Sequence, residues 1–291
     1  MILQLIANGI VIGCVYALVA LGFGLIYNTT RLFHFAHGVV YTTAAYVLFT
    51  LNILWGVNIF VAFTVAVALA AVLGMAMEIL VYLPLFKRGS PGILALISSL
   101  GIYIFLVNLI ALIFGNETKV LRPGIEKTYQ FADIILTRIQ VFELLGFLLI
   151  FPAFYLFLKK TKLGKSIKAL SNNPELATVI GINVNRVRLA VFAIGSLLAG
   201  VAACLVALDV GIDPNIGLSA VLTAAVVVIV SGVGIFEAAA LGAFLLGLTQ
   251  NLVIWKISAR WQDAITFIIL IAFLLLRPQG ILGKRFRLEE V

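Results

Sequence analysis

Residues 2–27 read ILQLIANGIVIGCVYALVALGFGLIY, a stretch that holds no charged side chain. At about 1.5 Å per residue, a helix of this length exceeds the roughly 30 Å hydrocarbon core of a bilayer. No basic region precedes it, and it is longer than the apolar core of a cleaved signal peptide. We therefore expect a retained membrane-spanning helix here.

The rest of the chain has the same character. It is 63% hydrophobic and only 11% charged, with a mean hydropathy of +1.20, whereas soluble domains are about 25% charged. The apolar runs are continuous, unlike the alternating strands of a membrane β-barrel. The sequence therefore predicts an all-α polytopic membrane protein with about 8–9 transmembrane helices in one domain, 1–291. Up to nine apolar segments can be drawn, at 2–27, 38–54, 59–85, 92–115, 141–158, 187–209, 217–235, 236–255 and 262–277.

Basic residues indicate the orientation of the chain. Residues 159–188 carry seven Lys or Arg and one Glu, and such loops favour the cytoplasmic side. With nine spans and this loop inside, fourteen basic residues fall inside and six fall outside. The N-terminus and the loop 116–140 then lie outside. A broken or re-entrant helix within 28–54 would instead move the N-terminus to the inside.

The sequence lacks the signatures of catalysis. It has no G-x-x-x-x-G-K-[ST] phosphate loop, no H-E-x-x-H and no G-x-S-x-G. His34 and His37 could share one helix face, but a metal site needs further ligands nearby. We expect no metal, no cofactor and no enzymatic activity. Since the net charge of +8 lies in loops beside spans, we also expect lipid rather than nucleic acid as its counterpart.

Few ionisable residues lie within or next to the apolar segments, where they are costly and usually functional. None of the segments carries a central pair of carboxylates, which argues against a proton-driven carrier. Small residues are plentiful instead, notably SGVG at 231–234. These glycines serve either close helix packing or a helix break that exposes backbone to a cavity. The acidic candidates are Glu78, Glu143, Asp209 and Glu237.

The loop 159–188 contains two predicted short helices. LGKSIKAL has apolar residues at helical spacing, and PELATVIG follows with Asn173 as the N-cap and Pro174 at the first helical position. Glu175 suits the helix dipole, and Gly181 suits a left-handed C-cap. A basic loop that attracts anionic lipid would explain the lysines. It does not explain a capped helix with an exposed apolar face, which suits a groove on a partner.

PELATVIGINVNRV also fits the pattern E-x-A-x-x-x-G at Glu175, Ala177 and Gly181, which resembles the cytoplasmic coupling loop of ABC importer permeases. Three further stretches resemble the branched-chain amino acid permease family in particular. They are ALGFGLIYNTTRLFHFAHGVVYTTAAY (20–46), LTAAVVVIVSGVGIFEAAALGAFLLGL (222–248) and LLLRPQGILG (274–283). The chain departs from the family's usual pattern at His34, where Asn is common, and at Ser231-Gly232, where Gly-Gly is common.

The resemblance implies one permease domain that works in a complex in the inner membrane. The expected partners are a second homologous permease chain, two ATPase subunits and a substrate-binding protein outside the membrane. The expected substrates are branched-chain or other neutral amino acids, with polar amino acids or urea as the alternative. A stand-alone secondary carrier or channel is the alternative of a different class.

The resemblance and the local chemistry together suggest three groups of residues. Neutral polar side chains and exposed backbone suit weak contact with a zwitterion, so we predict a substrate path at His34, His37, Gly38, Thr42, Thr43, Ser231, Gly232 and Gly234. Coupling to the ATPase is predicted at Lys168, Asn173, Pro174, Glu175, Ala177 and Gly181. The outside turn GIDPNIG offers Asp213 and Pro214 to the binding protein.

Overall fold

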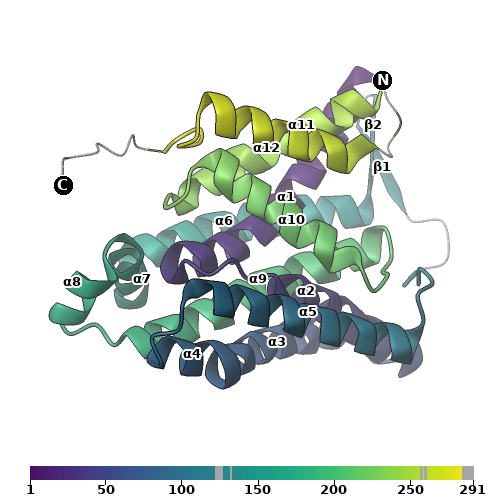
Figure 1. Cartoon of the computed structure of the whole chain (residues 1–291). Coiled ribbons are helices and arrows are strands. Elements are labelled where there is room, and N and C mark those ends of the chain that lie inside the picture. Colours follow the sequence, from purple (N-terminus) through teal and green to yellow (C-terminus); the bar gives the residue numbers. More distant parts are fainter. Residues whose placement is uncertain (122–126, 132, 256–257, 259–260, 284–291) are drawn as a thin grey trace.

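Figure 1 shows a computed structural model of the chain, which describes all residues except 122–126, 132, 256–257, 259–260 and 284–291. The helices that pass along the body are α1 (Ile2–Thr30), α2 (Ala36–Phe49), α3 (Ile59–Met77), α5 (Gly92–Phe114), α6 (Arg138–Lys160), α9 (Val184–Asp209), α10 (Ile216–Ser231), α11 (Ala239–Ile254) and α12 (Gln262–Leu276). The shorter elements are α4 (Leu83–Lys87), α7 (Lys162–Asn172), α8 (Pro174–Val179), the π-helical turns η1 (Thr50–Leu54) and η2 (Glu78–Tyr82), and the 3₁₀ turn η3 (Phe236–Ala238).

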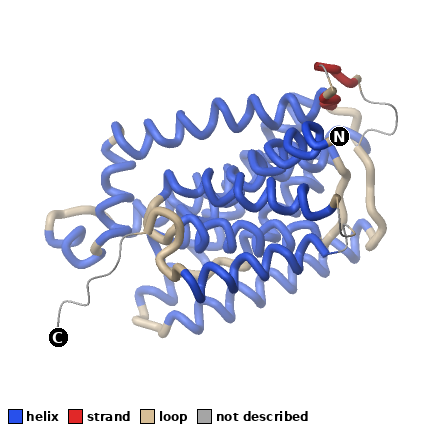
Figure 2. Tube along the Cα trace, turned by 90° about the horizontal axis from the view of Figure 1, so that it is seen from above, coloured by secondary structure: helices blue, strands red, loops and turns tan. Residues whose placement is uncertain are grey.

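The predicted all-α membrane architecture is confirmed. Each of the nine apolar segments contains one of the long helices, and most of these run along a common axis (Figure 2). By length and composition, six helical stretches within the described residues can cross a membrane, while α10, α11 and α12 are shorter apolar helices. The sequence did not predict the antiparallel hairpin of β1 (Thr128–Phe131) and β2 (Ile134–Thr137) in the loop 116–140.

The two ends of α1 mark the two sides of the molecule. Near its start, the Gln4 side chain exchanges hydrogen bonds of 2.8 and 2.7 Å with the backbone of Ile135 in β2. At its end, the Ser171 hydroxyl donates to the carbonyl oxygen of Asn28 at 3.0 Å. Figure 1 shows the N-terminus beside β1 and β2, with α7 and α8 at the opposite end. The N-terminus and the basic loop thus lie on opposite sides, as the nine-span topology requires.

Six of the Lys and Arg residues counted to orient the chain lie outside the described residues, as does most of the predicted LRPG turn. These six are Arg122, Lys256, Arg260, Lys284, Arg285 and Arg287. The Lys and Arg residues of the 159–188 loop are all described. The position of that loop, at the end opposite to the hairpin, therefore does not depend on the six that are not.

The chain re-enters the protein after α1. Arg31 adopts a left-handed conformation with φ 56° and ends the helix. The next segment turns back into the bundle. His37 lies against Gly22 of α1, since a Cβ built on Gly22 would be 3.3 Å from Nε2 of His37. Since Gly22 precedes the end of α1 by about 12 Å of helix, α2 begins well inside the protein. The backbone N–H of Ala36 is satisfied there by the Ser99 hydroxyl at 2.9 Å.

Helix α10 also begins below the surface. Ile212 pairs with Lys119 in the outside loop through two backbone hydrogen bonds of 2.8 and 2.9 Å. Only five residues later, Gly217 packs directly on the carbonyl of Gly38 near the start of α2. Residues 213–216 therefore dip into the bundle, and the starts of α2 and α10 meet in its interior.

Close helix contacts in the centre depend on glycine. A Cβ on Gly22 of α1 would lie 2.5 Å from the carbonyl oxygen of Gly195 in α9, and one on Gly195 would lie 2.8 Å from that of Gly22. Gly200 packs against Ala70 of α3, and Gly13 against Phe244 of α11. Because lipid offers no hydrophobic drive between helices, such contacts stabilise the bundle by dispersion. Helix α1 is therefore enclosed by neighbours whose backbones it touches.

We predict that Gly22→Ala destabilises the protein by about 1–3 kcal/mol, because the added methyl group must displace the α9 backbone. Gly101→Ala in α5 is the matched control, since a Cβ there meets nothing within 4 Å. The measurement is the thermal unfolding midpoint of each purified variant in the same detergent. Equal midpoints for the two variants would contradict the close contact between α1 and α9.

Candidate functional site

The loop 159–188 folds into the two predicted helices, α7 and α8. The Asn173 side chain accepts a hydrogen bond from the backbone N–H of Leu176 at 3.0 Å, with Pro174 at the first helical position. At the other end Gly181 has φ 83°, and the N–H of Ile182 donates to the carbonyl of Ala177 at 3.0 Å. This is a Schellman-type ending with glycine in the left-handed position. The predicted caps of α8 are confirmed.

Helix α8 projects from the end of the bundle (Figure 1), and it exposes an apolar surface. Leu176, Val179 and Ile180 are 61%, 82% and 71% exposed. Their spacing places all three on one face of the helix, while Ala177 is buried against the protein. Helix α7 anchors the unit, because its Ile167 and Leu170 are buried in the core.

The predicted coupling residues divide accordingly. Asn173, Pro174, Glu175 and Gly181 are exposed around α8. Ala177 lies beneath the helix, and Lys168 is half-buried on α7. The exposed members are therefore available for a partner, whereas Ala177 holds α8 in position.

A buried ion pair joins the start of α9, which follows this loop, to η2, which continues α3. Arg188, in the first turns of α9, donates from Nε to Oε1 of Glu78 at 2.6 Å and from Nη2 to Oε2 at 3.1 Å. Both side chains are less than a tenth exposed, and the guanidinium also lies 4.5 Å from the ring centroid of Phe86. A bidentate pair of this kind fixes orientation as well as distance. The sequence did not predict this pair, although Glu78 and Arg188 are opposite charges near the inner ends of two spans.

Glu78 opens the π-helical turn η2, and the other end of this turn reaches the predicted substrate path. The Tyr82 hydroxyl lies 3.0 Å from Nδ1 of His34, and the ring of Phe192 packs against both side chains. π-Helical turns are uncommon and often occur at functional sites. The five residues of η2 thus connect α9, next to the coupling loop, with the segment that leads into α2.

His34 and His37 do not share a helix face, because His34 lies in the non-helical segment before α2. Their rings still approach to 5.7 Å between centroids, and both side chains are fully buried. Nε2 of His34 and both ring nitrogens of His37 have no hydrogen-bond partner. Buried polar atoms are almost always paired, so these atoms need an explanation. Among the described residues, no group of three or more His, Cys, Asp or Glu side chains could hold a metal ion.

Gly38, Thr42 and Thr43 also pack in the interior. The Thr42 hydroxyl donates to the carbonyl of Gly38 at 3.1 Å, and that of Thr43 to Val39 at 2.7 Å. These internal bonds satisfy the hydroxyls in the observed conformation. Helix α2, which contains most of the 34–43 stretch, packs between α3, α5, α9 and α10.

The SGVG stretch breaks the helix, and it also packs closely, since a Cβ on Gly232 would lie 2.8 Å from the backbone N of Gly283. Helix α10 ends at Ser231, and Gly232 and Gly234 adopt φ 116° and 94°. The N–H of Gly234 donates to Oδ1 of Asn28 at 2.9 Å. Carbonyls freed at the end of α10 are satisfied by the LRPQGILG stretch, since Ile281 donates to Val230 at 2.8 Å and Leu282 to Ser231 at 3.1 Å.

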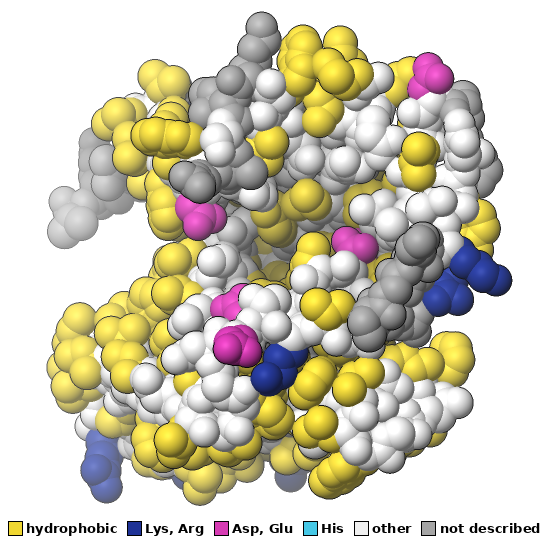
Figure 3. All heavy atoms as spheres, turned by 90° about the vertical axis from the view of Figure 1, so that its right-hand side faces the viewer, with side chains coloured by type: hydrophobic (Ala, Val, Ile, Leu, Met, Phe, Trp, Pro, Cys, Tyr) yellow, Lys and Arg dark blue, Asp and Glu magenta, His cyan; other side chains and the backbone are white. Residues whose placement is uncertain are grey.

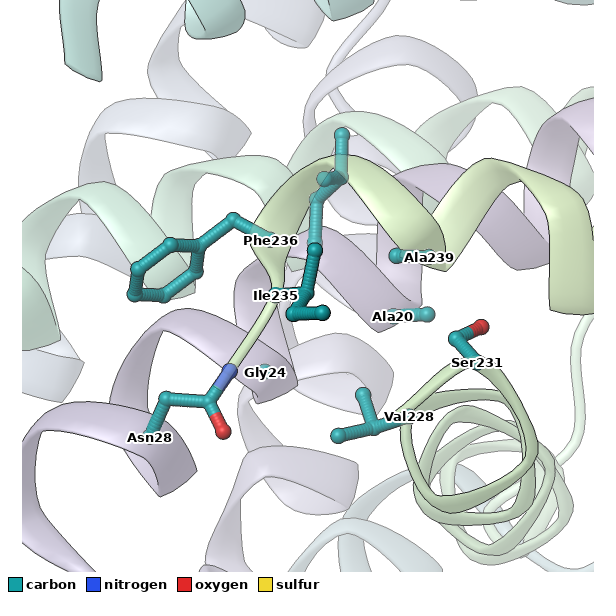
Figure 4. Close-up of a pocket in the computed structure, with 9 residues that line it drawn as sticks. Ala20, Gly24, Asn28, Val228, Ser231, Ile235, Phe236 and Ala239 are labelled. Atoms are coloured by element: carbon teal, nitrogen blue, oxygen red, sulfur yellow. The ribbon is translucent and has the colours of Figure 1, made fainter. Parts of the chain in front are cut away.

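Figure 4 shows a small pocket beside this break. Gly24 and Asn28 of α1 line it together with Ser231 and Phe236. The Ser231 hydroxyl is buried and has no hydrogen-bond partner. This pocket and the two histidines are not one site: His37 packs against Gly22 on one side of α1, whereas Asn28 faces the 231–236 turn on another.

The two residues predicted to meet the binding protein differ in exposure. Asp213 is partly exposed, and its Oδ1 accepts from the backbone N–H of Asn215 at 2.9 Å. Pro214 is buried, whereas Asn215 is exposed. Within residues 213–215, Asp213 and Asn215 therefore have accessible side chains and Pro214 does not.

Comparisons with known proteins find similar sequences over nearly the whole chain. The family model described as branched-chain amino acid transport system / permease component matches residues 5–274. The permease protein BraD of a Pseudomonas aeruginosa high-affinity branched-chain amino acid transport system is 30% identical, covering 97% of this chain and 96% of BraD. Escherichia coli LivH is 31% identical with the same coverage. A probable LivH of Methanocaldococcus jannaschii is 28% identical over 96% of this chain and 92% of its own.

The ion pair between Glu78 and Arg188 yields a stability prediction. Arg188→Met leaves a buried carboxylate without its partner, so we expect a loss of about 3–5 kcal/mol in the free energy of unfolding. Adding Glu78→Gln should restore part of that loss, because no buried charge then remains. The measurement is a double-mutant cycle on thermal or denaturant unfolding in detergent.

Arg186→Met is the control for this cycle, since Arg186 lies on the exposed face of the same helix turn. It should leave stability within about 0.5 kcal/mol of the parent. If Arg188→Met were as mild as Arg186→Met, or if the effects at 78 and 188 were additive, the ion pair would not hold these two helices together.

Proposed function

Because the chain belongs to the family of permease components of branched-chain amino acid transport systems, we propose that it is the membrane subunit of an ATP-driven importer for branched-chain or other neutral amino acids. It is a multi-pass protein of the inner membrane. In this proposal the chain offers alternating access and does no chemistry, since two separate ATPase subunits hydrolyse ATP. A second homologous permease completes the pathway, and an outside binding protein delivers the substrate.

The observation that carries the proposal is the exposed apolar face of α8. Three large apolar side chains at the tip of a basic loop cost free energy in water unless something covers them. An amphipathic helix presented in this way suits a hydrophobic groove, and the well-formed caps keep so short a helix folded before docking. An ATPase subunit that receives α8 would move it when the ATPase dimer closes.

Movement of α8 would have a route into the membrane. Helix α9 follows α8 directly, and the Arg188–Glu78 pair joins α9 to η2. Tyr82 then joins η2 to His34. In the observed conformation most predicted path residues are buried, although Gly234 is exposed and Thr43 is half-buried. Polar atoms of His34, His37 and Ser231 are buried without a hydrogen-bond partner. Water or a passing zwitterion would satisfy these atoms once the helices separate.

A stand-alone secondary carrier is the second candidate, and one observation favours it. The buried pair of Glu78 and Arg188 is an ionisable group within the helical body, and such groups often mark ion paths. A carrier, however, has no use for the capped and exposed α8. The same architecture carrying urea or polar amino acids is a further alternative, since His34 stands where the family often has Asn.

The importer proposal is tested by the mass of the intact complex purified in mild detergent from its native membrane. A complex with a second permease and two ATPase subunits is expected. A stable monomer or homo-oligomer without ATPase would overturn the proposal and favour the carrier.

We predict that Glu175→Lys lowers ATP-driven uptake at least tenfold while the protein remains in the membrane. The substitution reverses a charge in the first turn of α8, next to the apolar face, and opposes the helix dipole. The measurement compares uptake with ATP hydrolysis in proteoliposomes that hold the whole complex. Hydrolysis that continues without uptake is the expected signature.

Glu117→Lys is the matched control, an exposed charge reversal in the loop on the opposite side of the membrane. It should leave the ratio of uptake to hydrolysis unchanged. Normal uptake by Glu175→Lys would rule out α8 as the joint with the ATPase.

Charge at the outside turn should govern docking of the binding protein. Asp213→Lys is expected to raise the apparent KM for the substrate-loaded binding protein about tenfold, because charge complementarity steers such encounters. Asp213→Asn keeps the oxygen that accepts from the backbone N–H of Asn215 and removes only the charge. Its KM should therefore lie between that of the parent and that of Asp213→Lys. A KM unchanged by Asp213→Lys would place the binding protein elsewhere.

A further inference from the structure

The outer end of the molecule is hollowed between two lobes. Figure 3 views this end, and acidic side chains lie around the hollow. Helix α10 presents partly or fully exposed residues at positions 215, 219 and 222, which share one helix face. Helix α12 packs beside α10. Since α11 runs antiparallel to α1, with Gly247 on Gly9 and Phe244 on Gly13, the start of α12 lies at the outer end.

A small pocket lies between these two helices. Its lining combines one carboxylate, three hydroxyls and two large apolar side chains. The contributing residues are Ser219, Leu222 and Thr223 of α10 and Asp263, Thr266 and Phe267 of α12. Within the described part of the chain, no hydrogen bond or ion pair engages the side chains of Ser219, Thr223 or Asp263.

A buried hydrogen-bond network supports the wall of this pocket. The Tyr16 hydroxyl donates to Oε1 of Gln250 at 2.8 Å, and Nε2 of Gln250 donates to the Thr266 hydroxyl at 2.5 Å. Nε2 of Gln262 donates to the same Oε1 at 3.1 Å. Gln250 and Thr266 are only 1% and 2% exposed. A fully satisfied polar network in a low-dielectric interior is rigid, so it fixes the first turns of α12.

Simpler structural roles explain only part of this arrangement. A carboxylate in the first turn of a helix interacts favourably with the helix dipole, which accounts for Asp263 alone. Hydroxyls within a helix commonly satisfy themselves on their own backbone, as Thr266 does on Gln262 at 3.1 Å. Neither role explains why Ser219 and Thr223 of a different helix turn unsatisfied hydroxyls to the same small space, with Leu222 and Phe267 beside them.

We propose that this pocket binds the ammonium group of a neutral amino acid at the outer mouth of the pathway, an inference that rests on the proposed import function. The Asp263 carboxylate supplies the opposite charge, and the hydroxyls of Ser219 and Thr223 accept hydrogen bonds from the ammonium. Leu222 and Phe267 provide an apolar wall for an aliphatic side chain. The site selects amino acids over urea, which has no charged group for Asp263.

The experiment introduces Ser219→Cys into the complete complex and measures its rate of reaction with thiol reagents from outside. The native thiols Cys14 and Cys204 are buried, so the parent complex gives the background. The probes are a trimethylammonium methanethiosulfonate and a neutral one of similar size. We expect the cationic probe to react faster than the neutral one. Asp263→Asn should reduce the ratio of the two rates about tenfold, because one nearby negative charge is lost.

Protection identifies the ligand. Leucine should slow the labelling of Ser219→Cys, whereas urea and 4-methylpentanoate, which has leucine's side chain without the ammonium, should not. Asp263→Asn should abolish protection by leucine. The control is Asp133→Asn, which removes an exposed carboxylate on the hairpin and should change neither the preference nor the protection.

Two results would overturn the site: a probe preference unchanged by Asp263→Asn, or equal labelling with and without saturating leucine. Both readings are made without ATP, so they test the pocket itself. ATP-dependent leucine uptake by the parent complex is measured separately. Its absence would reject the importer proposal, and protection by leucine would still establish the pocket.

Discussion

The contact of α1 with its neighbours at the level of the backbone is the constraint on which the rest of this structure depends. In a membrane, helices gain nothing from hiding apolar surface, so they hold together only where shapes fit closely. Gly22 and Gly195 let α1 and α9 touch, and Gly13 lets α1 meet α11. Because α1 is enclosed in this way, α9, α10 and α11 all pack directly against it.

That enclosure leaves room for irregular backbone inside the bundle. Non-helical segments at membrane depth are tolerated only where protein or a cavity satisfies their polar groups. Three partners meet this need here: Ser99 at the start of α2, Asn28 at the turn after α10, and the C-terminal LRPQGILG stretch at the end of α10. The non-helical segments before α2 and after α10 therefore have backbone groups satisfied within the protein rather than exposed to lipid.

The polar side chains follow the same division of the molecule. At the inner end, α8 exposes an apolar face, and the pair of Arg188 with Glu78 leads from it toward His34. At the outer end lie Asp213 and the pocket around Asp263. Between these ends most residues of the predicted path are buried. In the proposed importer, ligand binding at the outer end and docking of α8 at the inner end would therefore depend on separate parts of one chain.

The membrane class, the apolar segments and the caps of α8 follow from the sequence alone, whereas SGVG left close packing and a helix break both open. The first three features depend on local physics: apolar length, the reach of Asn173, and the left-handed freedom of Gly181. Tertiary structure alone decided that Glu78 meets Arg188 across 110 residues, that His34 and His37 are buried together, that Pro214 is inside, and that α10 and α12 share a polar pocket. Spacing along a chain fixes which side chains share one helix face. Which faces of different helices meet depends on how closely their backbones approach, and this is set only when all the helices are packed.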